Sequence, residues 1–353
     1  MFRGWLSFVA AMLAALAGAR TERGPVVAAQ DADPFAFLAP VATVSPSERR
    51  RLDGGDVLAR TLAAGDRQAA ILVLARVRAA PEHLVAWTHA IERFKRGRFV
   101  VAIGRFSEPP VLEDLAGLSL DTEDVAALLR CRAGDCGLKL TAAEMRRFAA
   151  VRATPAAAAA DAVQATFRHA VLDRVQTYRG AGLAGLDPIA DREPRRTVEA
   201  FTALLERSPY LAGVAPLRDW LHRYPLAATP GDTFFYWSKE SYGSGKPVVA
   251  VTHVAIHRPP DGADAPAVVV AGKQLLATHY TVASLGLTMF LGGRDGGPAY
   301  LAYLNRTELD ILGGLFGRMA RAMMERRLSR QTPVVVDELR RRLESGMPSP
   351  ATP

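Results

Sequence analysis

Two spacings of apolar residues, one typical of strands and one typical of helices, follow each other in the first third of the chain. In the run 68–78 the apolar residues form two alternating sets, which predicts a β-strand. From Pro81 to Phe94 they recur every three or four residues, the stripe of a helix that lies on a core. The run 98–106 alternates again. We therefore expect a strand, a helix and a second strand in this order.

The middle of the chain, from about 141 to 224, has mostly helical patterns broken by glycine and proline. Strand patterns return after it, and the turn residues between them, such as Asp261-Gly262, leave room only for short connections. Short connections favour an antiparallel meander. The predicted strands of this meander lie at 233–240, 248–257, 267–280, 282–291 and 298–305.

An amphipathic helix is predicted after the last strand, with arginines outside its apolar stripe. The stripe contains Leu309, Leu312, Phe316, Met319 and Met323. A separate short helix is predicted to begin at Thr332-Pro333, because a capping residue followed by proline is typical of a helix start. Ser45-Pro46 has the same pattern nearer the start of the chain.

These elements predict three segments behind a leader. The segment 20–66 is a lead-in with one helix. The segment 67–330 is an α+β domain with a large helical insertion at about 141–224, and 331–353 forms a short C-terminal helix and tail.

The leader, 1–19, has the features of a cleavable secretory signal. Arg3 gives a basic start, roughly 12 to 14 apolar residues follow, and Ala17-Gly18-Ala19 fits a cleavage site. An uncleaved anchor is the alternative, but the apolar run is shorter than the about 20 residues of a membrane-spanning helix. We therefore expect a periplasmic or secreted protein, cleaved before Arg20 or, as a second site, after Ala28-Ala29.

The composition of the chain allows a sizeable core and suggests a basic surface. The chain has 353 residues, 49% of them hydrophobic, and a formal net charge of +8. The basic residues are mainly scattered arginines without a recognisable DNA- or RNA-binding motif, so we predict no nucleic-acid partner. A solvated basic surface is the simpler interpretation, and peripheral contact with an anionic membrane is the alternative.

The chain has only two cysteines, Cys131 and Cys136, separated by a stretch that contains Gly134 and Asp135. Such a stretch can turn and bring the two sulfurs together, and in an exported protein this predicts a local disulfide. A metal or redox site is the alternative, but no histidine lies nearby to complete a ligand set. We predict neither a metal nor another cofactor.

The order of these elements resembles the helix-grip superfamily, which includes START domains and Bet v 1-like proteins. The resemblance covers about 68–106 and 233–328, and it includes the run from Ile71 to Trp87 and Tyr300-Leu301-Ala302-Tyr303-Leu304-Asn305 before the final helix. It implies a curved antiparallel sheet packed on a long C-terminal helix, with a cavity for a lipid, sterol or other apolar molecule. The insertion is a departure from the family. It could cover the cavity, or it could indicate a different topology.

Residues on these strands and on the final helix are candidates for the wall of such a cavity. The aromatic run 234–237 alternates between the two faces of its strand, so at most half of it can face a ligand, and core packing is the alternative. Polar groups on the later strands could orient a ligand headgroup or simply face water. The predicted ligand-binding residues are Tyr236, Trp237, His253, Lys273, His279, Tyr303, Phe316, Met319 and Met323.

The positions of histidines and serines in the sequence favour a catalytic or metal site less than a ligand-binding cavity. His253 and His257 are roughly 13 Å apart along one strand, too far for one metal ion. Ser284 follows His279 and Ser238 precedes His253, but neither serine lies in a nucleophile motif. We therefore predict a non-catalytic protein that binds an apolar small molecule or lipid. The alternatives are a cavity-based enzyme, such as a hydrolase or cyclase, and a protein that interacts with another envelope component.

Overall fold

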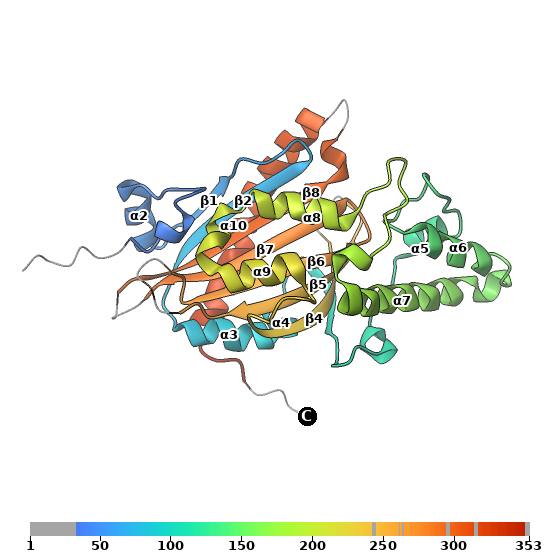
Figure 1. The fold of residues 1–353 in the computed structure, drawn as a ribbon, viewed down its shortest axis with the longest axis horizontal. Coiled ribbons are helices and arrows are strands. Elements are labelled where there is room, and N and C mark those ends of the chain that lie inside the picture. The colour runs from blue at the N-terminus through green and yellow to red at the C-terminus, as the bar shows by residue number, and fades with distance from the viewer. Residues whose placement is uncertain are drawn as a thin grey trace, which may run out of the picture. The chain divides into compact units, whose positions relative to one another are not determined.

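An eight-stranded antiparallel sheet forms the centre of the computed structural model (Figure 1). The structure describes residues 33–241, 245–260, 262, 265–293, 297–313 and 317–349, so the predicted leader lies outside the described residues. The strand order is β1-β2-β8-β7-β6-β5-β4-β3. The strands are β1 Val57–Thr61, β2 Gln68–Val77, β3 Val100–Arg105, β4 Gly231–Glu240, β5 Val248–His257, β6 Val268–Ala277, β7 Thr281–Gly292 and β8 Ala299–Leu309.

The meander predicted from the alternating patterns is confirmed. Strands β4 to β8 pair consecutively, and the last of them returns to pair with β2, where Ile71 lies opposite Asn305 and Val77 opposite Ala299. The predicted fold class is confirmed as well: a curved antiparallel sheet carries a long C-terminal helix and a large helical insertion.

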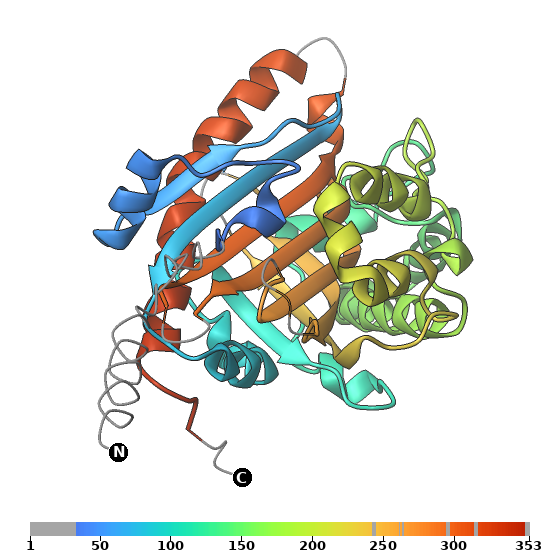
Figure 2. The same ribbon diagram turned by 60° about the vertical axis from the view of Figure 1, so that its left-hand side comes forward.

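Helices cover both faces of this sheet, as Figure 2 shows with the C-terminal helix on one side and the insertion on the other. Alternate residues of each strand therefore enter two different cores: Val251 and Ala255 face the insertion, whereas Val254 and Ile256 face the C-terminal helix. The helices are α2 Pro46–Asp53, α3 Pro81–His89, α4 Ile91–Phe94, α5 Thr122–Leu128, α6 Ala142–Val151, α7 Ala156–Ala181, α8 Thr197–Glu206, α9 Ala215–Arg223 and α10 Gly317–Glu344.

The helical insertion consists of α6 to α9, in agreement with the prediction for 141–224. Its longest helix, α7, has 26 residues and begins with the alanine run that favours helix formation. The side chains Phe167, Val171 and Val175 recur along one face of α7 and are buried against the sheet and the loops beside it. This packing stabilises the helix far more than its propensity does.

The disulfide predicted from the cysteine spacing is confirmed. Cys131 and Cys136 are bonded, and their Cα atoms are 4.5 Å apart. Backbone hydrogen bonds between Arg132 and Asp135 in both directions close the turn that joins them. The helix start predicted at Ser45-Pro46 is also present. The Ser45 hydroxyl accepts a hydrogen bond from the backbone N–H of Glu48, and the Glu48 carboxylate accepts one from the backbone N–H of Ser45.

Strand β1 was not predicted, because its segment was interpreted as lead-in. It pairs with β2 and places Leu58 opposite Leu74. The strand is short, and Leu58 is its one buried residue, so its sequence lacks the alternation that marks a strand. Residues from Asp33 onward form one compact unit, and the lead-in helix and β1 belong to it.

The two helices predicted at the C-terminus are a single helix, α10. Leu309 ends β8 and Leu312 lies in a short 3-10 turn, so neither begins the helix. Pro333 lies inside α10 and removes one backbone donor, but Val336 and Leu343 are buried against α3 and the sheet, and this packing keeps the helix continuous. Among the described residues, no helix has the length and apolar character that crossing a membrane requires.

Candidate ligand-binding pocket

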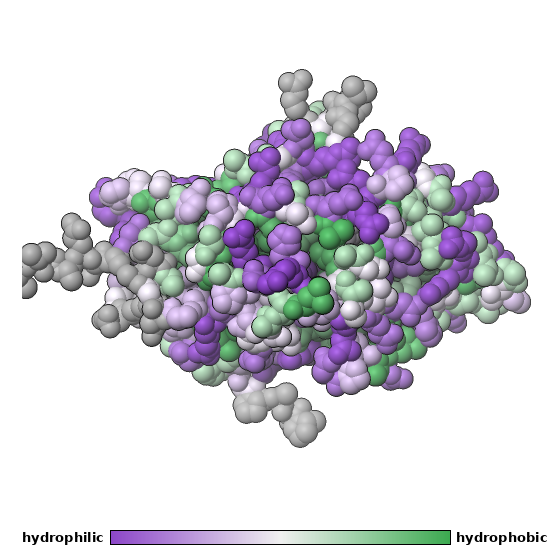
Figure 3. Space-filling view, in the orientation of Figure 1, coloured by the Kyte–Doolittle hydropathy of each residue, from purple (hydrophilic) through white to green (hydrophobic). Residues whose placement is uncertain are grey.

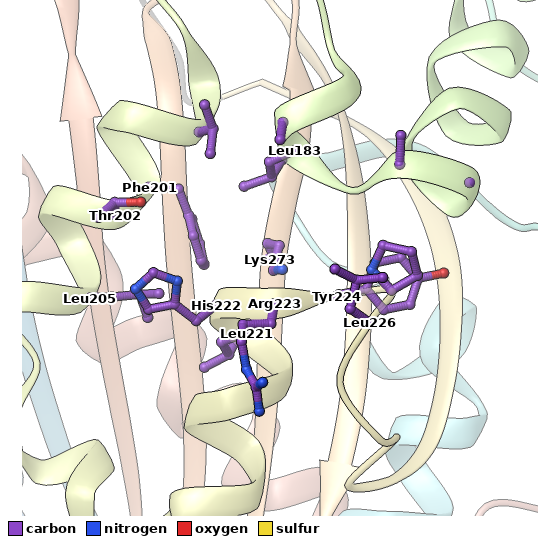
Figure 4. Close-up of a pocket in the computed structure, with 15 residues that line it drawn as sticks. Leu183, Phe201, Thr202, Leu205, Leu221, His222, Arg223, Tyr224, Leu226 and Lys273 are labelled. Atoms are coloured by element: carbon purple, nitrogen blue, oxygen red, sulfur yellow. The ribbon is translucent and has the colours of Figure 1, made fainter.

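A pocket of about 360 Å³ lies between the sheet and the helices of the insertion. Its walls come from the end of α7, from α8, and from the end of α9 with the residues after it, and Lys273 of β6 contributes from the sheet. Figure 4 shows the Lys273 amine between Phe201 on one side and Tyr224 on the other. Small-molecule pockets typically span about 300–1,000 Å³, so this one suits a compact ligand.

The end of α7 approaches the pocket closely because of a glycine. Gly182 follows the helix with a φ of +64°, a conformation that other residues rarely adopt. A Cβ atom at this position would lie 2.2 Å from the carbonyl oxygen of Tyr224. Gly182 therefore allows the chain after α7 to pack directly against the chain after α9, and this contact closes one wall of the pocket.

Four aromatic rings surround the amine of Lys273. Its Nζ atom lies 5.2 Å from the ring centres of Phe201 and Trp220, and 5.5 and 5.8 Å from those of Tyr178 and Tyr224. All four rings come from the insertion. The electron-rich faces of such rings attract a cation, by up to about 2 kcal/mol at a desolvated site.

Burial works against the charged form of the same amine. Lys273 is only 2% exposed, and this burial lowers its pKa from the ordinary 10.5 to about 7. The neutral amine, with a free electron pair, is therefore well populated at neutral pH. An ordinary surface lysine is almost entirely protonated under the same conditions.

Lys273 differs from the other lysines of the chain in having no carboxylate partner among the residues that the structure describes. The chain has five lysines. Lys95, Lys139, Lys239 and Lys246 each form an ion pair with an aspartate or glutamate. Over the described part of the chain, Lys273 Nζ has neither an ion-pair nor a hydrogen-bond partner. A buried amine without such a partner is costly, and this cost is typical of a site that serves a ligand.

His253 lies beside Lys273 on the neighbouring strand, and the two residues are opposite each other in the β5–β6 ladder. The His253 ring stacks on Phe235, with ring centres 4.0 Å apart, and its Nδ1 is 3.1 Å from the Tyr178 hydroxyl. Burial, together with the charges of Lys273 and Arg179, holds the pKa of His253 well below 6.5. His253 is therefore neutral and fixes the orientation of Tyr178.

Apolar side chains continue to the mouth of the pocket. Leu226 follows α9, lines the pocket and is 90% exposed. Figure 3 shows hydrophobic areas among hydrophilic ones on the side of the molecule that α8 and α9 cover. Arg223 lines the same rim and pairs with Asp219. An apolar molecule can thus contact hydrophobic surface from the rim down to the amine.

Comparisons with known proteins do not identify this chain. No family model matches it, and no curated protein matches it either. Among solved structures, the di-domain aromatase/cyclase StfQ from the steffimycin biosynthetic pathway has 16% sequence identity and a TM-score of 0.25, over 88% of this chain and 95% of that chain. A likeness this weak assigns neither a ligand nor a reaction, so the function has to be inferred from the pocket itself.

The sequence predicts a cavity between the sheet and the C-terminal helix. The pocket lies on the other face of the sheet, because Lys273 and His253 face the insertion. Tyr236 and Tyr303 do face the side of α10. There, Lys95 donates a hydrogen bond to the Tyr236 hydroxyl at 3.1 Å, and burial raises the pKa of Tyr303 to about 12. The sheet therefore separates these two tyrosines from the lysine pocket.

Trp237 and His279 have structural partners away from the pocket. The Trp237 indole N–H donates to the carbonyl of Asp114 at 2.8 Å, and its ring packs on Gly104, where any Cβ atom would collide with it. His279 is bonded through Nε2 to Asp124 and through Nδ1 to the carbonyl of Gly137, both at 2.8 Å. Both side chains attach the loops between β3 and α6 to the sheet.

The prediction that Met319 and Met323 line a buried cavity is wrong. They are 63% and 62% exposed, because the helix begins only at Gly317 and its buried side is formed by residues nearer its end, such as Val336. Phe316 lies outside the described residues. The exposed side of α10 also carries Arg326 and Arg330, and contact of this side with an anionic membrane stays a prediction.

The serines considered as nucleophiles have no histidine partner in the described part of the chain. The Ser238 hydroxyl donates to Glu240, and the Ser284 hydroxyl accepts a hydrogen bond from Asn305. The described residues also contain no group of three or more histidine, cysteine, aspartate or glutamate side chains arranged for a metal ion.

The four residues whose rings surround the Lys273 amine were not predicted, namely Tyr178, Phe201, Trp220 and Tyr224. Tyr178, Phe201 and Trp220 lie on helices of the insertion and Tyr224 directly follows α9, and aromatic residues at such positions are also typical of ordinary core packing. The sequence contained one indication of the pocket, and it lay on the sheet. Lys273 interrupts an apolar strand and lies between Ala271 and Leu275 on the same strand face.

Proposed function

We propose that this protein binds an apolar small molecule in the pocket between the sheet and helices α7, α8 and α9, and that the Lys273 amine holds the polar end of that molecule. One observation carries the proposal: a lysine that is 2% exposed faces four aromatic rings and has no carboxylate partner among the described residues. The apolar walls would contact the body of the ligand, and the amine would fix its orientation.

The volume of the pocket favours a compact molecule over a lipid with two long chains. A single chain or a ring system could extend past Leu226 into solvent. This proposal requires binding alone and no catalytic step.

Blocking the pocket should remove the bound molecule. Ala184 is exposed and lines the pocket, so Ala184→Trp adds bulk there without entering the core. Native mass spectrometry with solvent extraction, on protein purified from its own cells, should find an apolar molecule in the wild type. The variant should carry it at an occupancy at least about tenfold lower, because a steric clash opposes binding.

The matched control is Ala149→Trp, which adds the same side chain at an exposed position of α6 outside the pocket. It should keep the bound molecule. Equal occupancy in Ala184→Trp and the wild type would place the ligand elsewhere, and an empty wild-type protein that also binds no added apolar probe would contradict the proposal.

We also propose that the protein works outside the cytoplasm. The signal-like leader supports this, and so does the disulfide between Cys131 and Cys136, because disulfides persist mainly in oxidising compartments. Expressed in a bacterium, the full chain should be recovered from the periplasm or medium with Arg20 as its first residue, by cell fractionation and N-terminal sequencing. Recovery of the intact leader in the cytoplasm would contradict export.

A further inference from the structure

The environment of the Lys273 amine discriminates between the kinds of polar group that a ligand could bring to it. A buried carboxylate has about four acceptor sites and needs several donors to offset its desolvation. Around Nζ lie the faces of four aromatic rings, and a ring face donates no hydrogen bond. Of these four residues, Trp220 also has a buried indole N–H without an acceptor among the described residues, and this single donor is fewer than a carboxylate needs. A single carbonyl oxygen needs fewer hydrogen-bond donors. If the carbonyl condenses with the amine, the oxygen leaves as water and no acceptor remains to be satisfied.

The same environment suits the product of such a condensation. A protonated imine carries its positive charge at the position of Nζ, 5.2 to 5.8 Å from the four ring centres that face the lysine. It has only one N–H to satisfy, against three in the lysine ammonium. The rings therefore stabilise the charge, and the number of buried donors without a partner falls.

We propose that Lys273 captures a ligand with an aldehyde or ketone group by forming an imine with its carbonyl carbon. This rests on the proposed function, because the carbonyl compound has to enter the pocket already described. The structure contributes a nucleophilic amine in a largely apolar enclosure, which is a recognised way to activate a lysine.

The reaction is balanced without any further reagent. The electron pair of the neutral amine attacks the carbonyl carbon, and a proton moves from nitrogen to the carbonyl oxygen to give a carbinolamine. The hydroxyl group then takes a proton from solvent and leaves as water, while the nitrogen electron pair forms the C=N bond. The nitrogen keeps its remaining proton, so the product is the protonated imine. The low pKa of Lys273 supplies the neutral amine near pH 7.

Reductive trapping with a defined probe tests this reaction. The purified full chain is incubated at pH 7 with 2-naphthaldehyde and sodium cyanoborohydride, which reduces an imine to a stable secondary amine. Intact-mass analysis and peptide mapping then locate the adduct. Because a lysine with a pKa of about 7 has a neutral fraction about a thousandfold larger than an ordinary one, we expect modification of Lys273 to exceed that of each other lysine at least about tenfold.

Two variants separate reaction from binding. Lys273→Arg keeps a cation in the enclosure but cannot form an imine, so it should show no adduct at this position. Lys246→Arg changes a partly exposed lysine that pairs with Asp124 outside the pocket, so it should react as the wild type does. The rate of trapping at Lys273 should also rise with pH through about 7, as the amine loses its proton.

The outcomes distinguish this inference from the proposed function. The non-reactive analogue 2-naphthalenemethanol is titrated in parallel by calorimetry. If it binds and no adduct forms at Lys273, the imine is wrong and the binding pocket stands. Adducts spread evenly over all lysines would overturn the imine as well. If neither probe binds and the purified protein carries no apolar molecule, both proposals fail.

Discussion

Replacing Lys273 with methionine should stabilise the protein, by on the order of 4 kcal/mol at pH 6. Below pH 7 the folded protein has to keep a charged amine buried without a carboxylate partner among the described residues, and methionine of similar length removes this cost. A gain of this size from one substitution is unusual, since most single substitutions destabilise a protein. It would identify Lys273 as a residue retained for function at the expense of stability.

The gain should depend on pH in a defined direction. The pKa of Lys273 is about 7 in the folded protein and about 10.5 in the unfolded chain. Between these values the unfolded chain binds more protons, so wild-type stability rises with pH across this window. The advantage of Lys273→Met should therefore shrink to about 1 kcal/mol at pH 9.5. Urea unfolding of both proteins at pH 6 and pH 9.5 measures the difference.

Lys139 provides the matched contrast. It is also largely buried, but it pairs with Asp191 and Asp310. Lys139→Met should destabilise the protein, because it leaves two aspartates without their shared cation. If both substitutions destabilise the protein to the same degree, Lys273 has a counter-charge and the present description of its enclosure is wrong.

Replacing Asp124 with asparagine should destabilise the protein by about 3–5 kcal/mol at pH 7, the usual cost of removing one partner from a buried ion pair. Asp124 is 3% exposed and bonds His279 at 2.8 Å and Lys246 at 3.1 Å. His279 is buried as well and would lose its negatively charged partner. These contacts join α5 to the end of β6, so we expect the disulfide-bearing loop to become accessible to proteases in the variant.

The lowered pKa of Asp124 predicts that the protein loses stability at acidic pH. Burial alone would raise its pKa, but the hydrogen bond and charge of His279, together with Lys246, outweigh burial and lower the pKa below 3.8. The Asp124 contribution is therefore present above about pH 4 and is lost as the pH falls through the folded-state pKa. Urea unfolding between pH 3 and pH 7 should show a smaller decrease in stability for Asp124→Asn than for the wild type.

Glu123 is the control for this substitution, because it is the exposed acidic neighbour of Asp124 on the same helix. Glu123→Gln removes the same charge and should change stability by less than about 0.5 kcal/mol. A similar loss in both variants would mean that net charge, and not the buried pair with His279, accounts for the effect.

Local sequence was sufficient for the elements with strong patterns. Alternation predicted the strands β2, β3 and β4 to β8, and the short connections between β4 and β8 predicted that these five pair antiparallel. The cysteine spacing predicted the disulfide, and Ser45 predicted a helix start. Where the pattern was weak, prediction failed: β1 has one buried residue, and Pro333 suggested a helix boundary that packing of Val336 and Leu343 overrides.

The sequence by itself determined that Lys273 shares a strand face with Ala271 and Leu275, because side-chain direction alternates along any strand. It did not determine what covers that face. The rings of Tyr178, Phe201, Trp220 and Tyr224 come from helices that are distant in sequence, and only their packing on the sheet buries the amine. A polar residue on a strand is equally compatible with solvent and with a pocket. Burial, and with it the lowered pKa of Lys273, arises from these long-range contacts, which local periodicity does not encode.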